Sequence, residues 1–318
     1  MTTSSSVERA GALAVRRRAG GAGDVVFRRL STGAALTILI VLAGVAVFLA
    51  AEALPAITAD PAELPEGKSL VEYIAPLAFG TVLAALIAVV VAVPLAAAVA
   101  LFISHVAPRR LALTLGYVVD LLAAIPSIVY GLWGIFVLGP ASVGATEWLA
   151  ENLGFIPFFE GPASATGRTM LVAGLVLAVM ILPIVSAVAR EVFAQTPRRL
   201  QEGALALGAT RWEMIRMVVL PFGRSALISG AMLGLGRALG ETMAVTIILS
   251  VSGVITLNLI SSANPSTIAA NIALDFPESS GLAINALIAS GLVLFAITLV
   301  VNMAARAVIA RRANGEGS

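Results

Sequence analysis

The sequence has no cysteine, and His105 is its single histidine. Disulfide bonds, thiolate chemistry and a histidine metal site therefore find no support. Charge is also scarce, because Asp, Glu, Lys and Arg make up only 12% of the 318 residues, against about 25% in an ordinary soluble domain. We predict no catalytic residue, no metal ligand and no bound cofactor.

Apolar residues are abundant instead, at 59% of the chain. A water-soluble globule could not bury that much apolar surface, whereas transmembrane helices satisfy their backbone polar groups internally. The composition therefore predicts an all-α polytopic membrane protein.

Membrane spans are predicted from charge-free intervals, since about 20 apolar residues cross a bilayer. Six such intervals occur, and they lie between Arg29 and Glu52, Glu72 and His105, Arg110 and Glu147, Arg168 and Arg190, Arg224 and about Val254, and Glu278 and Arg306. The third contains Asp120, to which we assign a structural role, and the fifth contains Arg237 and Glu241. The sequence thus predicts six transmembrane helices.

Basic residues predict the orientation of these helices. Of the 20 lysines and arginines, 17 fall in the segments 9–29, 109–110, 190–224 and 306–312, which alternate with acidic loops. Because basic flanks stay in the cytoplasm, both termini are expected there. The basic charge is spread over four segments on one side, so it indicates topology rather than nucleic-acid binding.

The loop between the fourth and fifth spans, about residues 190–224, is longer than a turn requires. Thr196 followed by Pro197 is typical of a helix start, with threonine as N-cap and proline at the first helical position. The first helix is expected to end near Leu207, at Gly208.

A second short helix is predicted after that glycine. Thr210 precedes Glu213 by three residues, the spacing of a capping box, and the helix is expected to end before Pro221. Two interpretations are open: an amphipathic helix pair on the lipid surface, or a protruding helix that a soluble partner holds in a groove.

Arg237 and Glu241 are the two charges inside the fifth interval. Arg237 lies 13 residues beyond Arg224, which is about 20 Å along a helix and so near mid-membrane. At i and i+4 on one helix the two side chains share a face and can pair, which offsets part of an insertion cost of about 2.5 to 3.5 kcal/mol per charge. The pair either joins its span to neighbouring helices, or lines a water-filled path in which the guanidinium binds an oxyanion.

The stretch "EGALALGATRWEMIRMVVLP", residues 202–221, resembles the EAA loop of type I ABC importer permeases. That pattern is E-A-A, three residues, G, nine residues, then I-x-L-P. Gly203 stands where alanine is usual, and Val218 where isoleucine is usual. The resemblance implies the MetI-like fold and a coupling loop, about residues 196–221, that docks into an ATP-binding subunit through Glu202, Gly203, Ala204, Gly208, Leu220 and Pro221.

Two further stretches, "GRALGETMAV" and "LLAAIPSIVYGLWGIFVLGP", make the chain similar to the PstC family, permease subunits of bacterial phosphate ABC importers. The similarity covers about residues 79–306. It implies a role for Arg237 and Glu241 in phosphate translocation across the bacterial cytoplasmic membrane, without enzymatic activity in this chain. The implied partners are the sister permease PstA, two copies of the ATPase PstB and the periplasmic or lipid-anchored phosphate-binding protein PstS.

The expected organisation is a cytoplasmic tail at 1–29, a first span with an outer loop at 30–75, a permease core at 76–308 and a second tail at 309–318. Other functions stay open from the residues alone. Sulfate or molybdate would suit the same arginine. An ion-coupled secondary transporter would need no ATPase partner and often shows inverted repeats, of which none is visible. A membrane enzyme is disfavoured because the sequence lacks clustered catalytic groups.

Overall fold

The computed structural model describes residues 22–250 and 252–315, and the chain divides between Ala51 and Glu52 into two units that are described separately. Helix α1 (Ala22–Thr58) makes up the described part of the first unit and continues a short way into the second. It includes Arg28 and Arg29, so the helix is longer than the charge-free interval that predicted it.

In the described part of the chain, six helical segments are long and apolar enough to cross a membrane, as predicted. No β-strand element occurs among the described residues, which confirms the all-α class. The six segments are Gly23–Thr58, Leu70–Val106, Ser127–Leu153, Met170–Ala194, Arg211–Leu239 and Leu282–Ala307.

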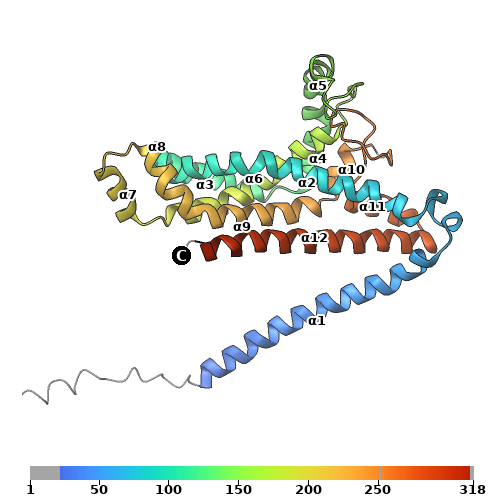
Figure 1. Cartoon of the computed structure of the whole chain (residues 1–318), viewed down its shortest axis with the longest axis horizontal. Coiled ribbons are helices and arrows are strands. Elements are labelled where there is room, and N and C mark those ends of the chain that lie inside the picture. The colour runs from blue at the N-terminus through green and yellow to red at the C-terminus, as the bar shows by residue number, and fades with distance from the viewer. Residues whose placement is uncertain (1–21, 251, 316–318) are drawn as a thin grey trace, which may run out of the picture. The chain divides into compact units, whose positions relative to one another are not determined.

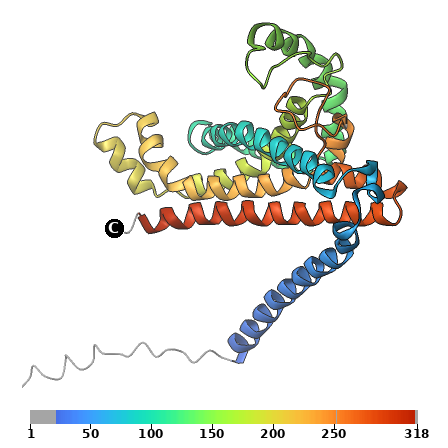
Figure 2. The same cartoon turned by 45° about the vertical axis from the view of Figure 1, so that its right-hand side comes forward.

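The second unit is a helical bundle. Helices α2 (Leu70–Leu101), α6 (Met170–Ala194), α9 (Leu220–Leu239) and α12 (Leu282–Gly315) run side by side in Figures 1 and 2. The short helices α7 (Arg198–Ala206) and α8 (Arg211–Met214) lie together at one end, and α5 (Gly139–Leu153) projects from the bundle nearer the other end.

Small residues allow α2 and α6 to pack closely at the centre of this bundle. The stripe of α2 that enters the core consists of fully buried alanines spaced four residues apart, Ala88, Ala92, Ala96 and Ala100. Side chains of this size let the helix backbones approach within van der Waals contact. Such packing stabilises helix pairs in a membrane, where apolar lipid provides no hydrophobic driving force for association.

The third predicted span is interrupted at Pro126. Helix α3 (Arg109–Ala123) ends before this proline and α4 (Ser127–Trp133) begins after it. One helix across the interval was therefore a wrong prediction, because proline has no N–H and disfavours helical geometry at the preceding residue. The carbonyl of Leu122, which a continuous helix would bond to residue 126, instead accepts the hydroxyl of Tyr130 at 2.8 Å.

The segment beyond α4 stays helical. It continues through the π-helical η4 (Gly134–Leu138) into α5. Short helical turns elsewhere connect the longer elements, namely η1 (Pro61–Glu63), η2 (Pro65–Gly67), η3 (Phe102–Val106) and η6 (Phe276–Glu278).

The fifth predicted span differs from expectation at both ends. The helix does not stop before Pro221, because α8 passes through the π-helical η5 (Ile215–Val219) into α9 without a break. Pro221 has no N–H, so one hydrogen bond of a regular α-helix cannot form there. The π-helical turn directly before the proline accommodates this loss without ending the helix.

The predicted continuation of the fifth span to about Val254 is also wrong. Helix α9 ends at Leu239, a short α10 (Met243–Ile248) follows, and the next helix is α11 (Ile268–Asp275). The intervening Gly240 has little helix propensity, and the side chain of Glu241 starts the next helix instead of continuing the last one.

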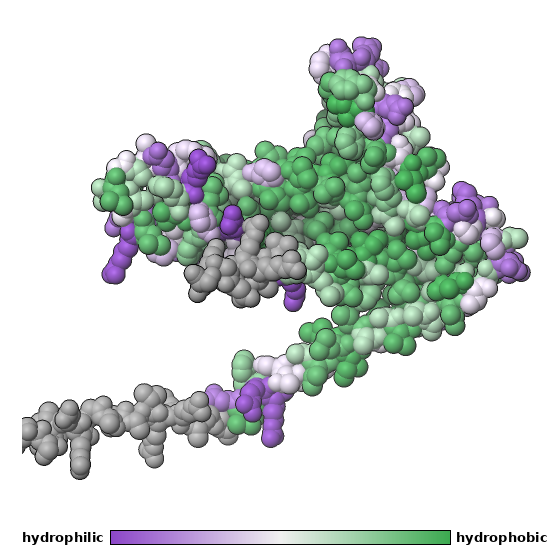
Figure 3. Space-filling view, in the orientation of Figure 1, coloured by the Kyte–Doolittle hydropathy of each residue, from purple (hydrophilic) through white to green (hydrophobic). Residues whose placement is uncertain are grey.

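Apolar residues dominate the visible surface of the bundle helices in Figure 3. Hydrophilic residues gather at the end that carries α7 and α8, at the tip of α5, and in the loop before α2. This distribution is the one expected of helices surrounded by lipid.

Candidate functional site

Arg237 lies in the last turn of α9 and is half-buried. Within the described residues its side chain makes no hydrogen bond and no ion pair. A side chain added at the neighbouring Gly236 would meet no atom within 4 Å. Since no described residue occupies them, the donors of Arg237 are available to a group from outside the chain.

Glu241 is 8% exposed and sits in the turn between α9 and α10. Its Oε1 accepts a hydrogen bond of 3.2 Å from the backbone N–H of Ala244. A carboxylate at the start of a helix satisfies an N–H that has no helical partner, and the helix dipole favours its negative charge. The Glu241 side chain therefore caps the first turn of α10 from the position before its N-cap residue, Thr242.

The predicted pairing of Arg237 with Glu241 on one helix face is wrong. The prediction assumed an uninterrupted helix, but α9 ends at Leu239 and the i to i+4 geometry is lost beyond it. Neither of the ion pairs among the described residues involves Arg237 or Glu241. The structure brings both residues to the same helix end without joining them.

A residue that sequence reasoning had treated only as a flank holds the other end of α10. The guanidinium of Arg168 donates to the carbonyls of Ile248 and Ile247 at 3.3 and 3.4 Å. It also reaches the carbonyl of Leu249 at 3.5 Å. These partners are about 80 residues from Arg168 in sequence, so no local pattern could have indicated the contact.

Helix α10 also packs tightly on α4. A Cβ added at Gly131 would lie 2.8 Å from the Cα of Ala244, so the two helix backbones are in direct contact there. Small residues at such crossings are typical of membrane helix pairs. This contact, together with the hydrogen bonds of Glu241 and Arg168 at the two ends of α10, holds α10 beside α4.

The coupling loop is exposed at the residues expected to dock. Glu202, Gly203 and Gly208 are exposed, and Gly208 has a left-handed φ of +88° with open space around it. Leu207 beside it is 92% exposed. The end of α7 at this glycine corner is therefore accessible from outside the chain.

The remaining residues of the motif face the bundle or its edge. Ala204 and Leu220 are partly buried and pack against one hydrophobic cluster, whereas Pro221 is exposed in the first turn of α9. The buried members of this cluster are Ala100 of α2, Ala189 and Phe193 of α6, Met214 of α8, and Ile215 and Val219 of η5. The coupling loop is therefore packed directly on two core helices.

The predicted helix starts of the coupling loop have different outcomes. The capping box of Thr210 and Glu213 is confirmed, since each side chain accepts the other's backbone N–H, at 2.8 and 3.3 Å. Thr196 is not a cap. The N-cap of α7 is Pro197, and the Thr196 hydroxyl is buried without a hydrogen-bond partner.

Residues 104–314 match the family model described as the binding-protein-dependent transport system inner membrane component. A similar sequence is "Phosphate transport system permease protein PstC 2" of Mycobacterium tuberculosis, 44% identical over 315 residues that cover 95% of this chain and 97% of the relative. "Phosphate transport system permease protein PstC" of Mycobacterium leprae is 46% identical over 281 residues, covering 85% and 88% of the two chains.

Solved structures share the fold at low sequence identity. A bacterial ABC transporter for import of the acidic polysaccharide alginate aligns with a TM-score of 0.52 at 16% identity, over 74% of this chain and 78% of that one. An inward-facing structure of the MetNI methionine ABC transporter aligns with a TM-score of 0.51 at 15% identity, over 76% and 95%. These likenesses concern the architecture of the helices.

Proposed function

Because the chain belongs to the family of binding-protein-dependent transport system inner membrane components, with PstC proteins as its relatives, we propose that it is a permease subunit of an ATP-driven importer of inorganic phosphate. We place it in the bacterial cytoplasmic membrane, with its termini and coupling loop in the cytoplasm. The permease performs no covalent chemistry, and ATP hydrolysis belongs to a partner subunit.

The observation that carries the substrate assignment is the state of Arg237. A half-buried guanidinium without a partner among the described residues is expensive in a membrane protein. An oxyanion that enters a wet passage between this subunit and the sister permease PstA would offset that cost. The planar guanidinium matches two phosphate oxygens at once.

Glu241 has a positioning role in this proposal. One of its carboxylate oxygens accepts the Ala244 N–H, and neither ion pair among the described residues joins it to Arg237. It holds α10 at the end of α9 and keeps one negative charge near the passage. That charge limits how tightly an anion binds, which a conducting site requires.

The coupling loop is proposed to receive the force of ATP hydrolysis. Two copies of the ATPase PstB would each hold one permease, here through the exposed face at Glu202, Gly203, Leu207 and Gly208. Motion of this face reaches α2 and α6 through the cluster around Phe193. ATP and the binding protein PstS then select between outward- and inward-facing states by their different affinities for the two.

Uptake of labelled phosphate by vesicles containing the complete reconstituted importer tests the proposal. Arg237→Gln is expected to lower uptake about 10- to 100-fold, since a hydrogen-bonded charged group contributes about 1.5–3 kcal/mol. Arg224→Gln is the matched control, because Arg224 is an exposed arginine of the same helix at its opposite end. Uptake by Arg237→Gln at the level of this control would contradict the role of Arg237.

The identity of the anion is tested in the same vesicles by competition. Unlabelled phosphate should abolish uptake of the label, and a tenfold excess of sulfate should leave it unchanged. Sulfate uptake that phosphate does not inhibit would overturn the choice of substrate while leaving the permease assignment in place.

A further inference from the structure

Helix α10 is too short to keep its place in the bundle unaided. It has six residues, Met243–Ile248, and isolated helices shorter than about 12 residues are marginal. Its N-cap residue Thr242 makes no side-chain capping bond, and the backbone is already extended at Leu249. The position of α10 therefore depends on contacts with residues outside the helix.

Arg168 makes the contact at the C-terminal end of α10. Its half-buried side chain donates to the carbonyls of Ile247, Ile248 and Leu249, at 3.4, 3.3 and 3.5 Å. The last carbonyls of a helix have no partner within it, and the helix dipole favours a cation at this end. Arg168 belongs to neither ion pair among the described residues, so these carbonyls are the acceptors for its guanidinium there.

The backbone that carries Arg168 is itself fixed. Its carbonyl accepts the amide N–H of the buried Asn264 at 2.9 Å, and the amide oxygen of Asn264 accepts the N–H of Met170 at 3.1 Å. Gly167, on the other side, has a left-handed φ of +70°, and a Cβ there would collide with the backbone of Gly139. Arg168 therefore reaches α10 from a rigid support directly before α6.

The other end of α10 is joined to Arg237 by a short turn. Only residues 240–242 separate α9 from α10. Within this turn the N–H of Glu241 donates to the carbonyl of Ala238 at 3.4 Å, and its carboxylate accepts the N–H of Ala244 at 3.2 Å. Ala238 directly follows Arg237, so a shift of α10 is passed to the arginine through a few bonded residues.

The end of α9 and helix α10 also share one hydrophobic cluster. Ala238 and Leu239 of α9 belong to it, together with Ala244, Val245 and Ile248 of α10, and all of them are buried. A closely packed interior transmits a displacement instead of absorbing it. A change at the C-terminal end of α10 is therefore expected to move the end of α9.

We propose that Arg168 is a positioning residue for anion transport: by fixing the C-terminal end of α10, it fixes the place of the Arg237 guanidinium in the passage. The proposal rests on the proposed function and adds a residue that does not touch the anion. Substitution of Arg168 should misplace Arg237 without removing it.

The first measurement is the amount of phosphate taken up per ATP hydrolysed by the complete importer in vesicles. A misfolded fraction lowers uptake and ATP hydrolysis together and leaves this ratio unchanged, whereas a misplaced Arg237 lowers the ratio. Arg168→Gln is expected to lower it about 2- to 30-fold, the range that a cation at a helix C-terminus contributes. Arg168→Lys keeps a cation at the carbonyls and should restore part of the ratio.

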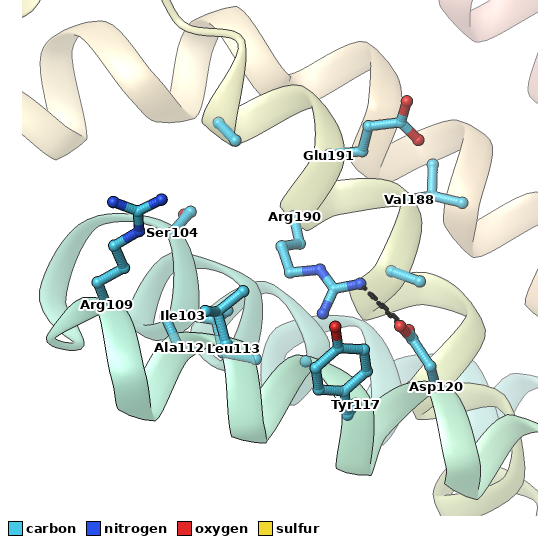
Figure 4. Close-up of a pocket in the computed structure, with 13 residues that line it drawn as sticks. Ile103, Ser104, Arg109, Ala112, Leu113, Tyr117, Asp120, Val188, Arg190 and Glu191 are labelled. Carbon is cyan, nitrogen blue, oxygen red and sulfur yellow. Dashed lines mark hydrogen bonds and ion pairs between the residues drawn. The ribbon is translucent and has the colours of Figure 1, made fainter.

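Arg190→Gln is the matched control, at the opposite end of α6. Arg190 also joins two helices, because its guanidinium pairs with Asp120 of α3 at 3.1 Å (Figure 4). The close fit depends on Gly116, where an added Cβ would collide with this guanidinium. The control thus removes an arginine from a long-range contact that does not involve α10. It should leave the ratio of phosphate to ATP unchanged.

A second measurement follows the position of α10 independently of transport. The chain has no cysteine, so Leu233→Cys on α9 and Met243→Cys at the start of α10 can carry two spin labels in an importer without other cysteines. Both positions are exposed. Arg168→Gln should shift or broaden the distribution of distances between the labels, and Arg190→Gln should leave it unchanged.

A lowered ratio together with a changed label distance in Arg168→Gln, and neither change in Arg190→Gln, supports the inference. An unchanged ratio or an unchanged label distance in Arg168→Gln overturns it, even where Arg237→Gln abolishes uptake and the proposed function stands. Equal losses of the ratio in Arg168→Gln and Arg190→Gln overturn it as well. Absence of phosphate uptake by the unmodified importer would instead count against the proposed function, and the label distances would still decide whether Arg168 places α10.

Discussion

Arg237 and Glu241 are four residues apart in sequence, yet the end of α9 at Leu239 separates them, and the Glu241 carboxylate bonds to the N–H of Ala244 instead. The arginine therefore keeps its donors while the glutamate organises the next helix. Two charges that look like one ion pair in the sequence have separate structural roles. This separation determines which substitutions should affect transport and which should affect stability.

Glu241 should affect stability through its oxygen rather than its charge. Glu241→Ala removes the acceptor for the Ala244 N–H and is expected to cost about 0.5–2 kcal/mol, the range for loss of a helix cap. Glu241→Gln keeps a carbonyl oxygen at the same place and should cost much less. Thermal unfolding in detergent measures both. Equal losses in the two variants would show that the charge itself holds this turn.

Substitutions in the coupling loop should separate effects on partner binding from effects on folding stability. Glu202 is exposed, and its side chain makes no hydrogen bond or ion pair with a described residue, so Glu202→Ala should leave the unfolding temperature unchanged. If the ATPase docks there, its affinity should fall about fivefold or more, as expected for an important interface residue. Copurification with the ATP-binding subunit at graded salt measures that affinity.

Thr210→Ala provides the opposite comparison. It removes the hydroxyl that accepts the Glu213 N–H and is expected to cost about 0.5–2 kcal/mol of stability. Loss of copurification in Thr210→Ala without a change in unfolding temperature would contradict the capping role.

Gly223 should be intolerant of even a methyl group. A Cβ at Gly223 would collide with the ring of Phe193, and overpacking of this kind costs about 1–3 kcal/mol. Gly236→Ala is the matched control on the same helix, because a Cβ there meets nothing within 4 Å. That control should be neutral or slightly stabilising. Thermal unfolding of both variants, and rescue of Gly223→Ala by Phe193→Leu, checks the contact.

The stability of the protein should depend on pH through Asp275, which lies outside the membrane spans. Burial raises the pKa of its carboxyl, an effect to which the nearby Glu278 and Glu66 add and which the hydrogen bond from Asn271 partly opposes. The folded state then holds the proton more tightly than the unfolded state, so stability falls as the pH rises above about 4 and through the raised pKa. Asp275→Asn should remove this part of the decline.

Unfolding temperatures measured from about pH 4 to 8 compare Asp275→Asn with the unmodified protein. The two curves should converge at the acid end, where Asp275 is protonated, and separate as the pH rises. Parallel curves across the whole range would mean that Asp275 titrates as an ordinary exposed carboxyl.

Several features could be predicted from the sequence because they are local. Apolar runs of sufficient length identify spans wherever they occur, and a capping box depends on residues three positions apart, as at Thr210 and Glu213. The glycine corner at Gly208 is likewise local, since its left-handed φ suits a residue without a side chain.

The predictions that failed depended on how helices end inside a bundle. Pro126 breaks the third span because it has no N–H and disfavours helical geometry at the preceding residue, and the Tyr130 hydroxyl then bonds the freed carbonyl of Leu122. Pro221 does not end a helix, because the π-helical turn η5 before it accommodates the hydrogen bond that proline cannot donate. Both residues are prolines in apolar surroundings. Neighbouring side chains and backbone geometry, which sequence patterns do not contain, decided the difference.

The sequence by itself determined that this chain is an all-α membrane protein with six spans and a capped helix in the loop between the fourth and fifth spans, since hydrophobic length and capping act over a few residues. Only the tertiary structure decided that Glu241 bonds to the N–H of Ala244, that Arg168 holds α10, and that Arg190 pairs with Asp120 beside Gly116. Contacts such as those of Arg168 and Arg190 join residues 70 or more positions apart. They exist only once the helices have packed, because side-chain partners are then chosen by distance in space and not by spacing along the chain.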